Sequence, residues 1–273
     1  MGYLKDVEDK VNMYEEASKM KLMAGLPIIC RLDGSAFSTF TKKLNRPYDI
    51  RLTNLMIECC KYLVEYTNAK VGFCGSDEIS LLIYEPDLNT QPIYNGRLEK
   101  MLSELPAKLS VRFNKLLPKF LPEKAHLEPY FDCKVWNVPT IEDAVNSLWM
   151  REESVFKNAI TMASLNYYSH KELECKNGSE KQEMLFQKGI NFNDYPVEFK
   201  RGVYIKRSKI LRKYTIDEIN KLPLKHKAKE NPNLEVERTE IVQLDIPPLK
   251  KIKNKVGVLI YSEEVKGFES DGI

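Results

Sequence analysis

The order of regular segments between residues 28 and 138 constrains the fold most. Apolar runs typical of strands occupy 28–32, 71–74, 79–84 and 130–138, and helical patterns occupy 49–66 and 97–120. The order is therefore strand, helix, strand, strand, helix, strand. This is the order of a split βαβ unit, an antiparallel, ferredoxin-like sheet with two helices on one face. We predict an α+β fold.

The rest of the chain gives a weaker pattern. We expect helices at 4–23 and through most of 141–192, and strands at 202–206 and 256–261. The pattern of 207–273 otherwise assigns no fold. We predict two units: residues 1–140 form the sheet unit with an N-terminal helix, and residues 141–273 form a mainly helical extension with a basic segment and C-terminal strands.

Composition excludes several classes of protein. Charged residues make up 30% and hydrophobic residues 43%, which is ordinary for a globular chain. No apolar run approaches a bilayer span and the first residues lack a signal-peptide core, so we expect no membrane partner. The six cysteines contain no CxxC pair, which indicates free thiols and a cytoplasmic protein.

Positive charge is concentrated in two stretches. The net charge is only +3, but basic residues crowd Lys200–Lys229 and Lys250–Lys255. This pattern fits either a polyanionic partner or a solvated face.

Three acidic residues occupy the ends of predicted strands. Asp33 ends the first strand, and Asp77 and Glu78 occupy the hairpin turn between the second and third. The first strand lies beside that hairpin in a split βαβ sheet, so Asp33 and Asp77 should face each other. Two such carboxylates repel unless cations lie between them, and carboxylate oxygens with substrate phosphates suit Mg²⁺. We predict a site for two Mg²⁺ ions that activates an attacking oxygen and stabilises a pyrophosphate leaving group.

Two further residues fit this site. Gly34 lets its carbonyl turn toward a metal and lets the following N–H groups approach a triphosphate. Arg46 is placed to clamp phosphate oxygens. Asp-Gly and Asp-Glu are also common in ordinary turns, but their occurrence together at one sheet edge favours a functional site.

Several motifs resemble the tRNA-His guanylyltransferase family of 3′-to-5′ polymerases. They are Arg31-Leu32-Asp33-Gly34, Phe37, Arg46-Pro47, Gly75-Ser76-Asp77-Glu78, Arg151 with Asn158, Lys181-x-Glu183-x-Leu185-Phe186, Ile190–Asp194 and Lys200-Arg201-Gly202. They occur in the family's order, over roughly residues 5–206.

The resemblance implies a polymerase-type palm and a role for each matched residue. The catalytic residues would be Asp33, Asp77 and Glu78, and the metal ligands Asp33, Asp77 and the Gly34 carbonyl. Nucleotide would be bound by the backbone of Ser35, Ala36, Phe37 and Ser38, by Ser76 and Arg46, and at a second phosphate site by Lys181 and Asn191. Arg151 and Asn158, on the helix after the palm, would also belong to the nucleotide-binding set, with Arg151 either binding phosphate or pairing with a glutamate.

The resemblance also implies a reaction. ATP would activate the 5′-monophosphate of a tRNA, and the 3′-hydroxyl of GTP or another nucleotide would then attack that end. The expected partners are nucleoside triphosphates and the 5′ end and acceptor stem of tRNA, with a homotetrameric enzyme.

This sequence differs from the eukaryotic members of the family. Ser154 and Phe156 replace an aspartate and a histidine. Tyr168–Leu173 and Asn193–Pro196 resemble bacterial and archaeal-type members, which are associated with template-directed repair of tRNA 5′ ends. Templated repair and guanylate addition to tRNA-His both stay open. The alternatives are a palm-fold nucleotide cyclase and a non-catalytic RNA-binding module.

Overall fold

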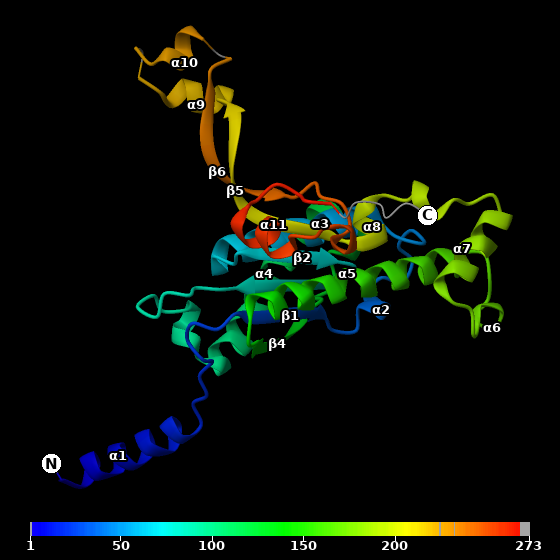
Figure 1. The fold of residues 1–273 in the computed structure, drawn as a ribbon. Helices are drawn as coiled ribbons and strands as arrows, with labels where there is room; N and C mark the ends of the chain where they lie inside the picture. Colours follow the sequence, from blue (N-terminus) through cyan, green and yellow to red (C-terminus); the bar gives the residue numbers. More distant parts are fainter. Residues whose placement is uncertain (1, 224, 232, 268–273) are drawn as a thin grey trace.

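A six-stranded antiparallel sheet forms the centre of the protein (Figure 1). The computed structural model describes residues 2–223, 225–231 and 233–267. The strand order is β4-β1-β3-β2-β5-β6. The strands are β1 (Ile28–Gly34), β2 (Val71–Gly75), β3 (Glu78–Ile83), β4 (Phe131–Asn137), β5 (Val203–Lys213) and β6 (Glu235–Gln243). The predicted mixture of helices with an antiparallel sheet is confirmed.

Helices cover both faces of this sheet. The longer helices of the chain are α1 (Gly2–Ala17), which projects away from the sheet (Figure 1), α3 (Ile50–Thr67), α4 (Leu98–Phe120), α5 (Ile141–Ser164) and α7 (Gly178–Gln187). The shorter ones are α2 (Phe37–Phe40), α6 (His170–Leu173), α8 (Val197–Arg201), α9 (Ile216–Lys221), α10 (Lys227–Glu230) and α11 (Lys255–Tyr261), with single 3₁₀ turns such as η3 (Phe192–Asp194) and η4 (Leu249–Lys251). Helices α3 and α4 pack on one face, and α5, η4 and α11 pack on the other.

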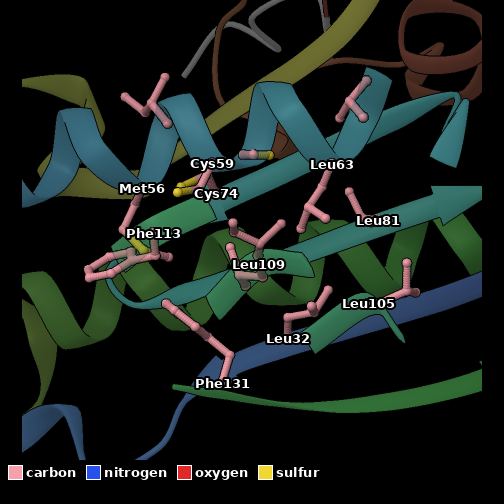
Figure 2. Packing of buried hydrophobic residues seen from close by; sticks show 14 of the residues in the cluster. Leu32, Met56, Cys59, Leu63, Cys74, Leu81, Leu105, Leu109, Phe113 and Phe131 are labelled. Atoms are coloured by element: carbon pink, nitrogen blue, oxygen red, sulfur yellow. The ribbon is translucent and has the colours of Figure 1, made fainter. Parts of the chain in front are cut away.

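The alternation of side chains along the strands produces two cores. Leu32 and Leu81 point toward α3 and α4, where they meet Leu63 and Phe113 (Figure 2). Their neighbours Ile29 and Leu82 point to the opposite face and join the α5 core. Because both faces are covered, the central strands are buried throughout, which explains their nearly continuous apolar sequence.

Helix α3 begins beside the loop that carries Arg46. The Asp49 side chain accepts a hydrogen bond from the Arg51 backbone N–H (3.0 Å), which caps the helix N-terminus. Asn68 ends the helix in a left-handed conformation. The Asp49 cap therefore fixes where the 41–49 loop ends and α3 begins.

The prediction for 256–261 was wrong: this segment is helix α11 and not a strand. A short apolar run does not distinguish a strand from a buried helix turn, and here Val258 and Leu259 pack against the α5 face instead of pairing at a sheet edge. The N-terminal helix is also shorter than predicted. It ends at Ala17 because the following chain is held in extended form, with the Leu22 N–H bonded to the Gly96 carbonyl and the Met23 N–H to Asn137.

Strands β5 and β6, most of whose length the sequence pattern did not assign, form a two-stranded arm. Strand β5 continues seven residues past the predicted 206 and pairs with β6 along its length. Figure 1 shows this arm, with α9 and α10 at its tip, projecting from the sheet. Arg212 joins its parts through ion pairs with Glu218 (2.7 Å) and Glu240 (2.6 Å).

Lys206 is a buried lysine, 4% exposed, where β5 leaves the body. Its Nζ donates to the Ser262 hydroxyl (2.9 Å) and the Ile260 carbonyl (3.3 Å), at the end of α11. Burial, with a smaller effect of Lys70, lowers the pKa of Lys206 to about 8. The protonated form is therefore less stable in the folded chain than in water.

This depressed pKa gives a signed prediction for stability. Between pH 8 and the ordinary lysine value of 10.5, the unfolded chain binds more protons, so Lys206 makes the free energy of unfolding rise with pH. In thermal melts, the melting temperature of wild type relative to that of Lys206→Met should increase as pH rises through this window. Lys209→Met is the control at an exposed position of the same strand. The difference in melting temperature between wild type and Lys209→Met should stay constant over this pH window. A parallel pH dependence for wild type and Lys206→Met would contradict the assignment.

The six cysteines are free thiols that differ in burial. Cys30, Cys59, Cys60 and Cys74 are buried free thiols, Cys133 is half-buried and Cys175 is exposed. In the described part of the chain, no helix is both long enough and apolar enough to cross a membrane.

Candidate active site

A cleft opens where β1, β2 and β3 end beside α5. Its volume is about 390 Å³. We call it the acidic cleft; it is lined by Asp33, Gly34, Ala36, Phe37, Ser38, Gly75, Ser76, Asp77, Glu78, Arg151, Val155 and Asn158. The cleft thus gathers residues from three separate stretches of the chain.

The two aspartates lie on adjacent strand ends. Asp33 is paired in register with Glu78, and the Gly34 N–H donates to the Asp77 carbonyl at 3.2 Å. Burial raises the pKa of the Asp77 carboxyl above its ordinary value, and the nearby Asp33 and Glu78 carboxylates raise it further. The site is therefore one in which ionised Asp77 lacks full solvation and stands beside like charge.

The turn that carries Asp77 is held on both sides. Ser76 and Asp77 form a two-residue hairpin turn, with Ser76 at a left-handed φ of 56°. Before the turn, Gly75 packs under α5, where an added Cβ would lie 2.6 Å from Val155 Cγ2. The hairpin predicted from the sequence is therefore present, and its position depends on α5.

The Glu78 carboxylate accepts hydrogen bonds from an arginine. Arg151 Nε donates to Glu78 Oε1 (2.7 Å) and its Nη2 donates to Oε2 (2.5 Å), a bidentate pair. Arg31 lies 3.9 Å from the same carboxylate, and Ser80 also donates to it. Of the two possibilities open for Arg151, pairing with a glutamate is the one observed, so both carboxylate oxygens of Glu78 accept hydrogen bonds from Arg151 at the edge of the cleft.

Loop 34–38 forms one wall of the cleft. Gly34 is required because a Cβ there would lie 2.3 Å from the Phe37 ring. That ring is buried against Phe40 and Phe131, which fixes the loop to the core. Ala36 has a left-handed φ of 55°, and the half-buried Ser35 donates its N–H to Tyr130 (2.9 Å).

A second pocket of about 340 Å³ continues from the acidic cleft. It shares six residues with the cleft: Phe37, Ser38, Ser76, Asp77, Val155 and Asn158. Its remaining lining includes Thr41, Asn45, Arg46, Tyr48, Asp49, Met162, Glu198 and Phe199. Tyr48 and Phe199 stack with centroids 4.7 Å apart, so the pocket combines an aromatic wall with polar edges.

Besides Ser35, which lines neither cavity, two further predicted residues lie outside both cavities. Lys181 Nζ donates to Thr161 Oγ1 (3.1 Å), one helical turn past Asn158 on α5. Asn191 caps η3 by accepting the Asn193 N–H (3.0 Å), and it lines a separate hollow beside α7. The structure does not bring these two residues into the acidic cleft.

Sequence reasoning missed the aromatic pocket and the α5 contact. Tyr48 directly follows the Arg46-Pro47 motif and Phe199 directly precedes Lys200-Arg201-Gly202, so each stood beside a motif that we had noted. Val155 gave no signal, because a valine on an amphipathic helix is ordinary core patterning.

The donor chemistry at the aspartates fits magnesium. Two carboxylates and a backbone carbonyl are hard oxygen ligands, and the proximity of Asp33 and Asp77 leaves negative charge for a cation to neutralise. Within residues 2–223, 225–231 and 233–267, no group of three or more His, Cys, Asp or Glu side chains forms a metal cage. Such a two-carboxylate site suits an ion whose shell is completed by substrate phosphates and water.

Comparison with known proteins gives consistent matches. Residues 8–139 match the family model described as tRNAHis guanylyltransferase. The tRNA(His) guanylyltransferase of Saccharomyces cerevisiae is 32% identical, over 71% of this chain and 89% of its own. A bacterial tRNA(His) guanylyltransferase (Thg1)-like protein in complex with ATP superposes with a TM-score of 0.75 at 28% identity, covering 93% of this chain and 99% of the other.

A second structure described as a bacterial Thg1-like protein, in complex with GTP, superposes with a TM-score of 0.73 at 27% identity, covering 94% and 99% of the two chains. Together the fold, the cleft and these matches define a nucleotidyltransferase. The match to the yeast enzyme extends over most of both chains, so it narrows this class to one family. The chain belongs to the tRNA(His) guanylyltransferase family.

Proposed function

We propose that this protein adds nucleotides to the 5′ end of tRNA in the 3′-to-5′ direction, after ATP activates the 5′-monophosphate. The observation that carries the proposal is the juxtaposition of Asp33 and Asp77 in a cleft that continues into a nucleotide-sized pocket. Family membership and the ATP- and GTP-bound relatives support the choice of substrates.

In this proposal Asp33, Asp77 and the Gly34 carbonyl hold two Mg²⁺ ions. The chemistry that bound Mg²⁺ supplies is charge neutralisation of the transferring phosphoryl group and activation of the attacking hydroxyl. Ser38, Ser76 and Arg46 bind the triphosphate, and the Tyr48–Phe199 wall packs against the base. Glu78 acts through its Arg151 pair by fixing the turn next to Asp77.

We further propose that the sheet is a polymerase-type palm. The order β4-β1-β3-β2, with α3 and α4 on one face and the acidic residues at the strand ends, supports this. In this division residues 1–140 form the catalytic unit and residues 141–273 the extension. Lys181 and Asn191 would serve a second phosphate site near the activated 5′ end, and the Lys200–Lys229 stretch of the arm would contact tRNA phosphates.

We propose template-directed repair as the physiological reaction. Phe156 stands where eukaryotic members carry histidine, and its ring packs edge-on against Phe192 with Lys250 above it at 5.1 Å. The Phe156 side chain itself offers no hydrogen-bond donor or acceptor to a particular added nucleotide. Base pairing with the opposite strand then selects what is added.

The test uses tRNAs that lack the first 5′ nucleotide and differ in the opposite-strand base. With ATP, all four NTPs and Mg²⁺, we expect the 5′ end to lengthen by the complementary nucleotide. Addition of G regardless of the opposite base would instead support guanylate addition. Binding without lengthening would support an RNA-binding module, and a cyclic product from GTP alone would support a cyclase.

Arg46 gives a separate prediction. Its exposed side chain lines the pocket next to Ser38 and, in this proposal, contacts triphosphate equally in the ground and transition states. Arg46→Ala should therefore raise the KM for NTP about tenfold, equivalent to ~1.4 kcal/mol, with kcat little changed. Lys43→Ala, an exposed position in the same loop, should leave KM unchanged. Equal KM values for wild type and Arg46→Ala would remove Arg46 from the nucleotide site.

We also propose a cytoplasmic homotetramer. Free, mostly buried thiols fit a reducing compartment. Apolar residues such as Leu4 (76% exposed) and Tyr14 (65% exposed) on the projecting α1 favour assembly with other copies. Light scattering of the purified protein measures the mass directly.

A further inference from the structure

Glu152, next to Arg151 on α5, is a buried carboxylate with several donors. It is 2% exposed. Its Oε2 accepts from the Tyr204 hydroxyl (3.0 Å) and the Leu249 N–H (3.2 Å), and its Oε1 accepts from Arg201 Nη1 (3.3 Å). Burying a carboxylate is unfavourable unless such partners satisfy it, so this arrangement holds its members in one geometry.

These donors join α5 to the C-terminal strap, by which we mean residues 244–267. Leu249 belongs to the strap itself, and Arg201 reaches it through Nη2, which donates to the Ile246 carbonyl (2.5 Å). The buried strap residues Ile252 and Leu259 pack in the same core as Leu148 of α5. The strap is therefore fastened to α5 by polar contacts at Glu152 and by apolar packing.

The same turn of α5 holds the hairpin that carries Asp77. Arg151 forms the bidentate pair with Glu78, and Val155 lies against Gly75. These contacts flank Ser76 and Asp77 on both sides. Because consecutive helix positions move as one body, any displacement of Glu152 also displaces Arg151 and Val155.

We propose that Glu152 is a positioning residue through which the C-terminal strap fixes α5, and thereby the Asp77 turn, in the acidic cleft. Glu152 touches no substrate; it acts through Arg151 and Val155. The role of the strap is thus to complete the active site from outside the β4-β1-β3-β2 unit. The effect on nucleotide addition rests on the proposed function, whereas the effect on the turn does not.

Hydrogen–deuterium exchange of the full-length protein tests the inference without substrate. The Gly34 amide is a direct reporter, since it donates to the Asp77 carbonyl, and the amides of residues 75–78 report the turn. In Glu152→Ala we expect these amides to exchange at least about tenfold faster relative to the other amides of the sheet, which corresponds to ~1.4 kcal/mol. Tyr204→Phe, which removes one donor, should produce a smaller change at the same amides.

Two further variants separate positioning from loss of stability. Leu105→Ala removes a buried α4 side chain on the opposite face of the sheet, so it should lower the melting temperature without selective exchange at Gly34 and 75–78. Glu152→Gln keeps an oxygen acceptor for Tyr204 and Leu249 but replaces the acceptor for Arg201 by an N–H donor, so it should restore part of the protection lost in Glu152→Ala. Exchange in Glu152→Ala that matches the Leu105→Ala pattern would overturn the inference.

The activity readout then links the turn to catalysis. For an equal amount of folded protein, kcat should fall about tenfold or more in Glu152→Ala and recover in part in Glu152→Gln. Wild-type kcat in Glu152→Ala despite accelerated exchange would overturn the link from the turn to catalysis. If wild type adds no nucleotide, the proposed function fails, and the exchange experiment still decides whether the strap positions the turn.

Discussion

Asp77→Asn should strongly reduce nucleotide addition and at the same time raise the melting temperature of the metal-free protein. Activity should fall by about 10²- to 10³-fold, because the variant loses a charge that stabilises the transferring phosphoryl group. Stability should rise because the pKa of Asp77 is raised in the folded protein. A folded-state pKa above the ordinary 3.8 means that stability falls as pH increases through this range, so ionised Asp77 destabilises the fold at pH 7.

The melting temperature also reports magnesium binding. Adding Mg²⁺ should raise the melting temperature of wild type and leave that of Asp77→Asn nearly unchanged, since ligands stabilise only the state that binds them. Asp132→Asn is the matched control: Asp132 is exposed and pairs with Asp33 across β1 and β4, but it does not line the cleft. It should retain both activity and the Mg²⁺ effect. An active Asp77→Asn enzyme would refute the assignment of this carboxylate.

Gly75→Ala should cause the second large loss. The new Cβ would lie 2.6 Å from Val155 Cγ2, so α5 and the Asp77 turn must separate. We expect a loss of about 1–3 kcal/mol of stability and up to about a 10²-fold loss of kcat, since a misplacement near 1 Å has effects of that size. Melting curves and steady-state kinetics measure the two losses independently.

The double variant Gly75→Ala/Val155→Ala tests whether the contact between residue 75 and Val155 causes the losses of stability and kcat. Removing the valine methyl groups makes room for the added Cβ, so the two substitutions should be non-additive by about 0.5–3 kcal/mol, and the double variant should be more active than Gly75→Ala. Strict additivity would mean that α5 does not constrain the turn at this point.

Local patterns were sufficient to predict the sheet unit but not the extension. The strands between 28 and 138 carry apolar runs bounded by turn residues, and the Asp33–Asp77 proximity followed from their order alone. The 256–261 run has the same local composition as a strand, and only its packing on α5 makes it a helix. The arm lacks a hydrophobic pattern because its stability comes from β5–β6 pairing and surface ion pairs such as Arg212–Glu218.

The candidate site likewise contains residues that the sequence predicts and residues that only the fold reveals. Its charged residues stood in recognisable motifs, so they could be found in the sequence. The aromatic wall joins Tyr48 to Phe199, some 150 residues apart, and only the folded chain brings them within 4.7 Å. Likewise the Arg151–Glu78 pair was one of two open possibilities until the position of α5 was known.

Strand β5 is continuous from the central sheet to the tip of the arm. Its 11 residues, at about 3.3 Å each, make it roughly 36 Å long, and its first residues are hydrogen-bonded to β2 beside the Asp77 turn. The arm and the cleft are therefore joined by one uninterrupted strand, which sets the distance between them. An RNA held at the tip would present a point at a set distance to the cleft, so substrates could be selected by length as well as by sequence.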